Sequence, residues 1–167
     1  MLSPGSLDIG PLTRTYAECH AQELLALGVD NDWENWTVDN LLAERPGKWE
    51  LSQVARVGAV AAGYAICSRR AEGLHLHHFI VGPAFRNGGI GIHLLEQLSR
   101  NALGCGLSAI TLKVHLKNSR AIRFYERSGF KSGISEGGLL WMLAESAAIL
   151  RNINLGKFSA ASRVTFD

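Results

Sequence analysis

The sequence predicts a layered α/β domain built around a mixed β-sheet. Patterns typical of strands and of helices alternate through the middle of the chain, and a hairpin pattern lies on each side of that middle. Elements of both kinds must bury an apolar face, and stacked layers are the stable way to do so. The 167 residues suit one domain of ordinary size, and we find no repeat or linker that divides them.

The first half of the chain is expected to form a strand, two helices and a hairpin. Apolar residues recur at helical spacing up to Gly28, and Thr37 is a suitable N-cap for a second, shorter helix. Gly58 marks the turn of the hairpin. The expected elements are a strand at 6–12, a helix at 15–27, a short helix after Thr37, and strands at 49–57 and 59–70.

The second half alternates strands with helices. Residues 109–117 switch regularly between apolar and polar side chains, which is typical of a half-buried strand. Asn118 can cap the following helix, and Gly129 ends it. The segment after Ala144 carries less pattern. The expected elements are strands at 74–81, 109–117, 130–134 and 139–145, and helices at 89–104 and 119–128.

Composition argues against several classes of protein. Hydrophobic residues make up 47% and charged residues 19%, which indicates a globular chain. The net charge of +2 comes from scattered side chains, so we expect no nucleic-acid partner. Three well-separated cysteines without a CxxC indicate a reducing, cytoplasmic setting. No signal peptide is evident and no apolar run approaches the ~20 residues that span a bilayer, so we expect no membrane partner.

A glycine-rich turn between the strand at 74–81 and the next helix is suited to holding phosphate. The first amides of a helix lack partners and carry partial positive charge, and glycines let the backbone approach an anion. Within Arg86–Gly91 these amides could surround a pyrophosphate, with Arg86 assisting. No P-loop lysine follows, and Leu94 stands where a dinucleotide-binding fingerprint needs a third glycine. A merely tight connection is the alternative.

Two motifs at a set separation carry more information than the turn alone. The stretch "VGPAFRNGGIG" is followed by an amphipathic helix, an alternating strand and "NSRAIRFYERSGF". In this combination residues 74–143 resemble the GNAT superfamily of acyl-CoA N-acyltransferases. Arg86-x-x-Gly89-x-Gly91 matches the R/Q-x-x-G-x-G/A coenzyme A motif of that family. The second signature of the family matches at Asn118, Ala121, Phe124, Tyr125, Glu126, Gly129 and Phe130.

The resemblance implies a single-domain GNAT fold. Its sheet would be mixed, mostly antiparallel and twisted, splayed at the fourth strand by a bulge at Phe79–Val81, with helices on both faces. We expect this domain at 1–145 and a C-terminal extension at 146–167 that extends the sheet, covers the acceptor cleft or mediates dimerisation. The expected state is a monomer or a homodimer.

The resemblance also implies acetyl-CoA as cosubstrate, with no metal. The amide of Phe79 would face the thioester carbonyl, Val81 would pair with the pantetheine arm, and Tyr125 would lie near the sulfur. Amides of Asn87–Gly91 would hold the pyrophosphate, and Asn118 would contact the coenzyme. The predicted cosubstrate-binding residues are Phe79, Ile80, Val81, Arg86, Asn87, Gly88, Gly89, Ile90, Gly91, Asn118 and Tyr125.

Three histidines lie in the strand before the glycine turn. An alkyl amine titrates near ~10.4, so only about one molecule in a thousand is nucleophilic at pH 7. A histidine, with a reference pKa near ~6.5, is suited to accept the amine proton, and a tyrosine to protonate the departing thiolate. Strand alternation places His75 and His77 on one face and His78 on the other, unless a bulge begins earlier. The predicted catalytic residues are His75, His77 and Tyr125.

The pair His75-x-His77 is similar to the H-x-H of serotonin (arylalkylamine) N-acetyltransferases at the same offset from the glycine motif. Two other interpretations stay open: hydrogen bonding in a polar groove, and zinc binding, for which no third ligand is signalled. His78 is expected to be structural. For Tyr125 the alternative is packing of an amphipathic helix on the sheet.

The segment "VDNDWENWTVD" between the first two helices is acidic and carries two tryptophans. In the GNAT family this segment commonly shapes the acceptor site. Carboxylates attract cations, and indole faces bind them through cation–π contact. The sequence therefore predicts a small-molecule amine, bound at Trp33, Glu34 and Trp36. A solvated acidic surface whose tryptophans pack on the core is the alternative.

Two classes of function compete. The first is an N-acetyltransferase that moves an acetyl group from acetyl-CoA to a primary amine by direct attack in a ternary complex. A protein N-terminus or lysine is the alternative acceptor. The second class is a non-catalytic module that binds coenzyme A. Retention of Tyr125, His75, His77 and the full glycine motif favours the enzyme.

Overall fold

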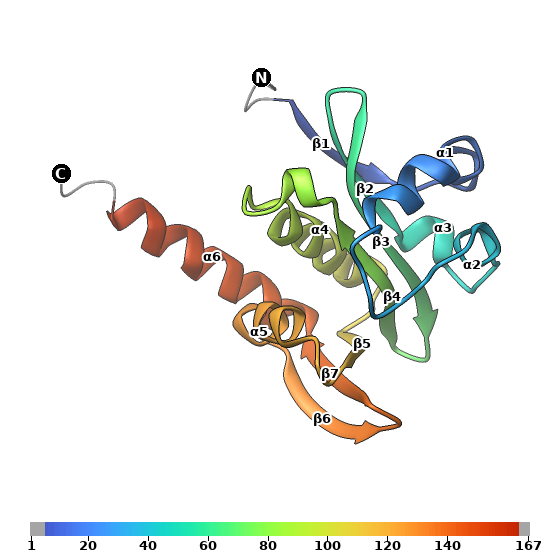
Figure 1. Ribbon diagram of the computed structural model, residues 1–167. Coiled ribbons are helices and arrows are strands. Elements are labelled where there is room, and N and C mark those ends of the chain that lie inside the picture. Colours follow the sequence, from blue (N-terminus) through green and yellow to red (C-terminus); the bar gives the residue numbers. More distant parts are fainter. Residues whose placement is uncertain (1–5, 164–167) are drawn as a thin grey trace.

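The computed structural model describes residues 6–163, with side chains as far as residue 156. These residues form a seven-stranded sheet flanked by helices (Figure 1). The strands are β1 (Leu7–Pro11), β2 (Gln53–Val57), β3 (Val60–Arg70), β4 (Gly73–Val81), β5 (Ala109–His115), β6 (Lys131–Glu136) and β7 (Leu139–Glu145). The helices are α1 (Arg14–Leu27), α2 (Val38–Leu42), α3 (Lys48–Leu51), α4 (Ile90–Gly104), α5 (Ser119–Ser128) and α6 (Ser146–Arg163), with a 3₁₀ turn at Pro83–Phe85.

The strand order is β1-β2-β3-β4-β5-β7-β6. Neighbouring strands are antiparallel except for β4 and β5, which are parallel. The parallel pair needs a crossover connection, and α4 supplies it. The expected mixed, mostly antiparallel sheet is confirmed, and β4, which carries the predicted catalytic histidines, lies at its centre.

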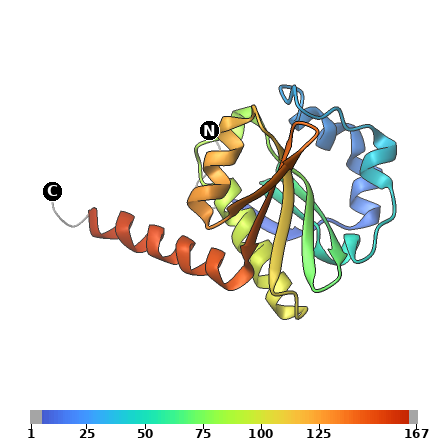
Figure 2. The same ribbon diagram turned by 90° about the horizontal axis from the view of Figure 1, so that it is seen from below.

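Helices cover both faces of the sheet, as expected. On one face α1 and α2 bury Leu24 and Leu41 in an apolar cluster with Ile66 of β3. On the other face α4, α5 and the start of α6 form a larger cluster in which Leu95 packs near Leu112 of β5. Figure 2 shows the two groups of helices on opposite sides of the strands. The predicted α/β layering therefore follows from separate apolar clusters that the helices form against the sheet.

The sheet splays between β4 and β5. These strands pair only from Gly73–Leu76 to Ala109–Leu112. Beyond that point β4 continues to Val81 beside β3, and β5 continues to His115 beside β7. The splay at the fourth strand is thus confirmed, and it leaves the facing edges of the two strands without a strand partner.

A bulge in β4 lies earlier than the resemblance implied. In the ladder with β3, His78 pairs with Ile66 and Leu76 pairs with Cys67, so His77 is the extra residue. The expected position at Phe79–Val81 is therefore wrong by at least two residues. A bulge inserts one residue into one strand, which bends that strand and shifts the alternation of its side chains.

The early bulge brings all three histidines to one face of β4. Without it, residues three apart in a strand point to opposite faces. In the structure His75 lies edge-on to His77, and His78 lies beside Tyr64 and Trp36 on the face covered by α1 and α2. The expected placement of His78 on the opposite face is wrong, and the extra residue is the physical reason.

Residues 49–51, expected to begin a strand, instead complete the helical turn α3. Gly47 adopts a left-handed conformation with φ of 69°, and the turn begins at the next residue. The buried ammonium of Lys48 donates hydrogen bonds of 2.6 Å to the carbonyl oxygens of Leu41 and Ala43, at the end of α2. These carbonyls would otherwise lack partners, so the tertiary contact overrides the strand-like pattern.

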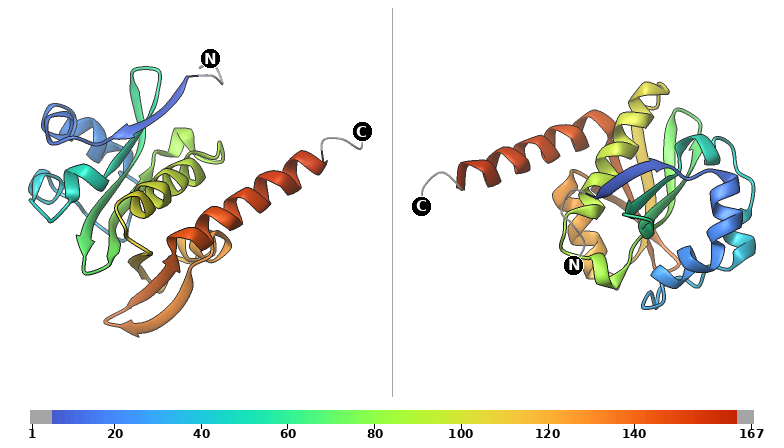
Figure 3. Two further views of the ribbon diagram at one scale, coloured as in Figure 1. Left: turned by 180° about the vertical axis from the view of Figure 1, so that it is seen from behind. Right: turned by 90° about the horizontal axis from the view of Figure 1, so that it is seen from above.

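The segment after residue 145 forms α6, whose first turns pack on the domain. Ile149 and Ile153 are buried in the larger apolar core, whereas Leu155 is exposed. Figure 3 shows the rest of α6 running outward from the body of the molecule. In the part of the chain that the structure describes, no helix combines the length and the apolar character that crossing a membrane requires.

Gly63 holds β3 and β4 close together, which gives the first prediction. A Cβ at Gly63 would lie 2.7 Å from the carbonyl oxygen of Ile80, whereas one at Gly10 would meet no atom within 4 Å. We expect Gly63→Ala to lower the free energy of unfolding by about 2 kcal/mol, because forced overpacking costs roughly 1–3 kcal/mol. Gly10→Ala, the matched control, should stay within ~0.5 kcal/mol. Urea unfolding measures both, and equal stabilities would contradict the steric argument.

Candidate active site

A cavity of about 450 Å³ lies between the end of β4, the turn after it, α4 and α5. Most of the predicted cosubstrate-binding residues come together in its wall. They are Phe79, Ile80, Val81, Arg86, Asn87, Gly89, Ile90, Gly91, Asn118 and Tyr125. Gly88 does not line this cavity. The grouping fits the predicted binding of a coenzyme here, and the individual contacts stay predictions.

The glycine turn presents the N-terminus of α4 to this cavity. Asn87 and Gly89 have φ of 65° and 82°, in the left-handed region that glycine and asparagine tolerate best. Gly89 is the N-cap, and none of the described side chains caps the helix there. The first amides of α4 are therefore suited to an anion.

Arg86 makes contacts that sequence reasoning did not foresee. Its guanidinium donates to both carboxylate oxygens of Asp30, with Nη2 at 2.9 Å from Oδ1, and its Nε donates to the carbonyl oxygen of Val81 at 3.1 Å. The guanidinium, chiefly through the hydrogen bond, holds the pKa of Asp30 below its usual range. Arg86 thus ties the glycine turn to the segment after α1, and a direct contact with phosphate stays a prediction.

A smaller cavity of about 90 Å³ occupies the opening between β4 and β5. It adjoins the larger one, and the residues that line both are Asn31, Trp33, Phe79, Asn118, Ala121 and Tyr125. Tyr125 is buried, and burial raises the pKa of its phenol, which therefore keeps its proton at neutral pH. A phenol between two cavities is placed to donate a proton to a group that reaches the junction.

The two predicted catalytic histidines differ in their access to this space. His75 is 4% exposed, its Nδ1 lies 2.8 Å from the hydroxyl of Thr111, and it lines neither cavity. His77 lines the smaller cavity, and its Nε2 lies 2.6 Å from the hydroxyl of Ser68. The structure therefore brings the predicted pair together, but it places only His77 in a cavity wall.

Both rings have a depressed pKa. Burial is the largest cause and lowers the pKa of His75 to about 4, with a further contribution from Arg70. Burial also lowers the pKa of His77 to about 3, assisted by Arg45. At neutral pH both rings are uncharged and able to accept a proton, but they are weaker bases than an ordinary histidine.

His78, expected to be structural, lines the smaller cavity. Its Nδ1 lies 2.8 Å from Oε2 of Glu34, and the indole of Trp36 stacks on the ring with centroids 4.3 Å apart and planes 7° apart. The bulge at His77 produces this placement, and no local sequence pattern signals it. The place of His78 in the cavity wall and its pairing with Glu34, which was predicted only as an acceptor-binding residue, are the main site features that sequence reasoning missed.

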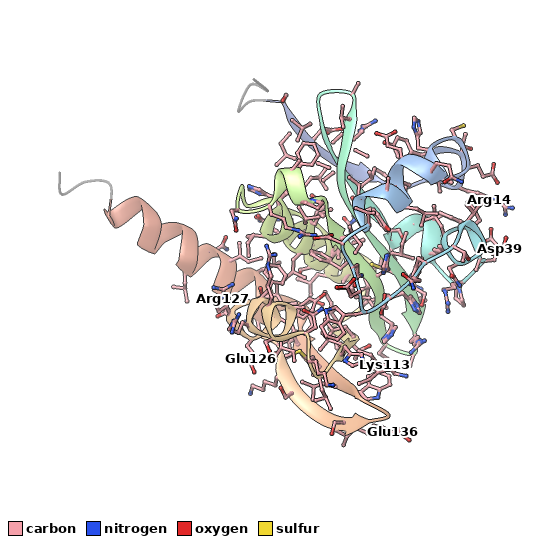
Figure 4. All side chains as sticks on the ribbon, in the orientation of Figure 1. Arg14, Asp39, Lys113, Glu126, Arg127 and Glu136 are labelled. Carbon is pink, nitrogen blue, oxygen red and sulfur yellow. The ribbon has the colours of Figure 1, made fainter. Side chains whose placement is uncertain are left out.

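The segment between α1 and α2 forms one wall of the smaller cavity. Trp33 is 40% exposed, lines both cavities and stacks on His115 of β5 with centroids 4.8 Å apart. Glu34 also lines the smaller cavity, whereas Trp36 packs on the α1 core, as the structural alternative proposed. Figure 4 shows side chains filling the region between this segment and β5, with Lys113 labelled at its edge.

Among the residues whose side chains are described, no group of three His, Cys, Asp or Glu side chains is arranged to hold a metal ion. The hydroxyl partners of His75 and His77 are Thr111 and Ser68. The structure thus gives the histidine pair hydrogen-bond partners of the kind expected in a polar groove.

The depressed pKa values predict loss of stability in acid. The rings titrate near 6.5 when unfolded but at about 4 and about 3 when folded, so between these values the unfolded chain binds more protons. The contribution of both rings to stability is complete above pH ~6.5 and falls as pH is lowered toward 4. Urea unfolding from pH 7 to 4.5 should show a shallower loss for His75→Gln combined with His77→Gln than for the parent. NMR titration of either ring with a midpoint near 6.5 would contradict the burial argument.

Comparison with known proteins gives the family. The model of the acetyltransferase (GNAT) family matches residues 12–130. An uncharacterized N-acetyltransferase of Methanocaldococcus jannaschii is 31% identical over 85 residues, which cover 47% of this chain and 38% of that relative. The match thus spans well under half of the relative's length.

Solved structures share the fold. Ard1 from Thermoplasma volcanium has a TM-score of 0.73 at 19% identity, over 84% of this chain and 97% of that one. The PaiA N-acetyltransferase of Thermoplasma acidophilum, solved with coenzyme A, has a TM-score of 0.70 at 18% identity, over 84% and 99%. The ribosomal-protein-S18-alanine N-acetyltransferase of Escherichia coli has a TM-score of 0.69 at 21% identity, over 83% and 93%. With its glycine motif, splayed sheet and a family match over most of its length, the chain belongs to the GNAT family of acetyltransferases.

Proposed function

We propose that this protein moves an acetyl group from acetyl-CoA to a primary amine, which attacks the thioester directly in a ternary complex. One observation carries the proposal. The cavity beside the uncapped N-terminus of α4 meets the histidine-lined cavity at Tyr125, so a cosubstrate and an acceptor can approach each other from opposite sides.

The larger cavity suits coenzyme A by its chemistry. The amides at the start of α4 are complementary to a pyrophosphate, and the left-handed Asn87 and Gly89 shape the turn around them. Past Leu76, the edge of β4 that faces β5 has no strand partner among residues 6–163. The amide groups of a pantetheine arm are able to pair with such an edge, as an added strand would.

The junction of the cavities suits acyl transfer. Phe79 and Tyr125 line both spaces, so a thioester placed there has a backbone amide on one side and a phenol on the other. An amide donor stabilises the oxyanion of a tetrahedral intermediate, and the phenol supplies a proton to the departing thiolate. An imidazole in the smaller cavity accepts the proton of the attacking amine.

A small-molecule amine is the favoured acceptor. Glu34 supplies a carboxylate in the smaller cavity, Trp33 supplies an indole face, and the space of about 90 Å³ suits the end of a slender molecule. A protein N-terminus or lysine is the second candidate. Free-thiol release from acetyl-CoA, with amines and short peptides as separate arms, tests the two. Turnover of peptides alone would reject the small amine, and coenzyme binding without turnover of either would indicate the non-catalytic module.

A negative charge introduced into the glycine turn tests the proposed coenzyme site. A Cβ at Gly88 would have only the carbonyl oxygen of Phe85 nearby, at 3.7 Å, so the position has room for a side chain. We expect Gly88→Asp to weaken coenzyme A binding by about tenfold or more at low salt, because it adds a negative charge to the turn that would hold the pyrophosphate. Gly88→Asn, of the same shape but neutral, should stay within about threefold. Calorimetry measures both, and equal affinities would place the diphosphate elsewhere.

Tyr125 tests the chemistry without disturbing the coenzyme. We expect Tyr125→Phe to lower kcat by about 100-fold, because the leaving thiolate loses its proton donor, while the affinity for coenzyme A changes little. Steady-state kinetics and calorimetry separate the two quantities, and thermal unfolding checks that the buried ring still packs. An unchanged kcat would remove Tyr125 from the mechanism.

A further inference from the structure

We propose that His78, oriented by Glu34, is the imidazole that takes the proton from the attacking amine. The proposal rests on the acetyltransferase function proposed above and names the base of that reaction. It differs from the sequence-based prediction, which placed the base at His75 or His77. Four features of the structure support it. They are the position of the His78 ring, its tautomer, its fixed orientation, and the absence of these features at the two neighbouring histidines.

The bulge in β4 determines the position of the His78 ring. The extra residue His77 turns His78 toward the face of the sheet on which the segment between α1 and α2 lies. There His78 lines the smaller cavity, whose wall also contains Tyr125, the proposed proton donor. An acceptor in this cavity would have the base on one side and the thioester at the junction on the other.

Glu34 determines which ring nitrogen of His78 carries the proton. Its carboxylate accepts a hydrogen bond from Nδ1–H of His78 over 2.8 Å, because an ionised carboxylate only accepts. The other ring nitrogen, Nε2, then carries the lone pair, and within residues 6–156 the structure gives it no hydrogen-bond partner. A carboxylate behind an imidazole fixes the reactive tautomer and stabilises the imidazolium that forms when a proton arrives.

Aromatic rings packed around His78 restrict the orientation of its imidazole. Trp36 stacks almost parallel on the imidazole, and Tyr64 lies at a tilt with centroids 5.5 Å apart. Tyr64 is fully buried and its hydroxyl has no partner among the described residues. Burial raises the pKa of this phenol, so it adds no charge of its own. The ring of His78 is held in one orientation, which a positioned base requires.

The neighbouring histidines lack these features. His75 lines neither cavity, and Nε2 of His77 is already engaged with Ser68. Their partners are hydroxyl groups, which donate or accept with equal ease and so do not fix a tautomer. Among the described side chains no carboxylate pairs with either ring to stabilise a positive charge, and nearby Arg45 and Arg70 oppose one.

The proposed reaction moves one proton from the amine to His78 and one from Tyr125 to the thiolate. The amine nitrogen forms a bond to the thioester carbon, and its proton passes to Nε2 of His78 while the carbonyl oxygen takes up negative charge. Collapse of this intermediate breaks the carbon–sulfur bond, and the thiolate takes a proton from Tyr125. The imidazolium then returns a proton to the phenolate through solvent. The products are the N-acetyl amine and free coenzyme A, with no net change in protons for an amine that binds uncharged and with one proton released to solvent for an amine that enters as ammonium and loses that proton before it attacks.

Several titratable groups surround His78. They come from the α1–α2 segment, β3, β4, β5 and α5, and they are Glu34, Tyr64, His77, Lys113, His115 and Tyr125. A change in the pH profile therefore identifies the base only when it follows substitution of His78 itself and not substitution of its neighbours.

The test compares four variants and one control variant with the parent protein. We expect His78→Gln to lower kcat by about 100-fold at pH 7, with a loss that shrinks toward pH 9.5 as solvent deprotonates more of the amine. Glu34→Gln should show a smaller loss, and Glu34→Asp should recover part of it. His77→Gln should lose much less than His78→Gln. The matched control is His20→Gln, an exposed ring on α1 that should leave the rate unchanged.

A second measurement reads the orientation without any acceptor. Long-range proton–nitrogen NMR at pH 8 should show His78 protonated on Nδ1 in the parent and should show a loss of that preference in Glu34→Gln. Coenzyme A affinity and thermal unfolding should change little in all four variants, which separates a role in catalysis from damage to the fold.

The outcomes are distinguishable. Parental turnover with an equally active His78→Gln, a larger loss in His77→Gln, or protonation of His78 on Nε2 would each overturn the base assignment while leaving the acetyltransferase intact. A parent that binds no coenzyme A, or acetylates neither amines nor peptides, would overturn the proposed function itself.

Discussion

The parting of β4 from β5 after Leu76 is the constraint on which the rest of the structure depends. Up to that residue the strands share a parallel ladder, and beyond it each has a strand neighbour only on its outer side. Both cavities lie along the edges that this parting exposes. A continuous ladder would satisfy the same backbone groups internally, and it would leave neither free edges for a pantetheine arm nor room between the strands for an acceptor.

The bulge at His77 and the α1–α2 segment both place side chains around this opening. The bulge turns His78 toward the segment, which supplies Glu34 and closes over the opening to stack Trp33 on β5. The segment is also held at its start, where Asp30 pairs with Arg86 of the glycine turn. One loop therefore contacts both halves of the proposed site, so the geometry of the acceptor side is coupled physically to the turn that would grip the coenzyme.

Sequence predicted those features that local chemistry determines. Leu112 is buried as the alternation of β5 predicted, and Asn118 caps α5 as predicted. Both features depend on interactions within a few residues of the chain. The face of His78 depends instead on one extra residue in a ladder with another strand, which leaves no local mark. The partner of Arg86 was equally hidden, since Asp30 lies 56 residues away and meets it only in the folded chain.

In the proposed reaction, the carboxylate of Glu34 in the smaller cavity distinguishes an amine acceptor from its amide product. Glu34 is the one acidic side chain in the described lining, and Lys113 is its one lysine or arginine. His77 stays neutral at pH 7, because burial and nearby cations depress its pKa. The carboxylate of Glu34 would attract the ammonium form of the proposed acceptor. Among the residues whose side chains are described, His78 is the one of the two β4 histidines in this lining that has a carboxylate partner to stabilise a transferred proton. In the proposed reaction, acetylation converts a cationic acceptor into a neutral amide, which removes its attraction to the carboxylate. The same carboxylate would thus hold the proposed substrate more tightly than the product.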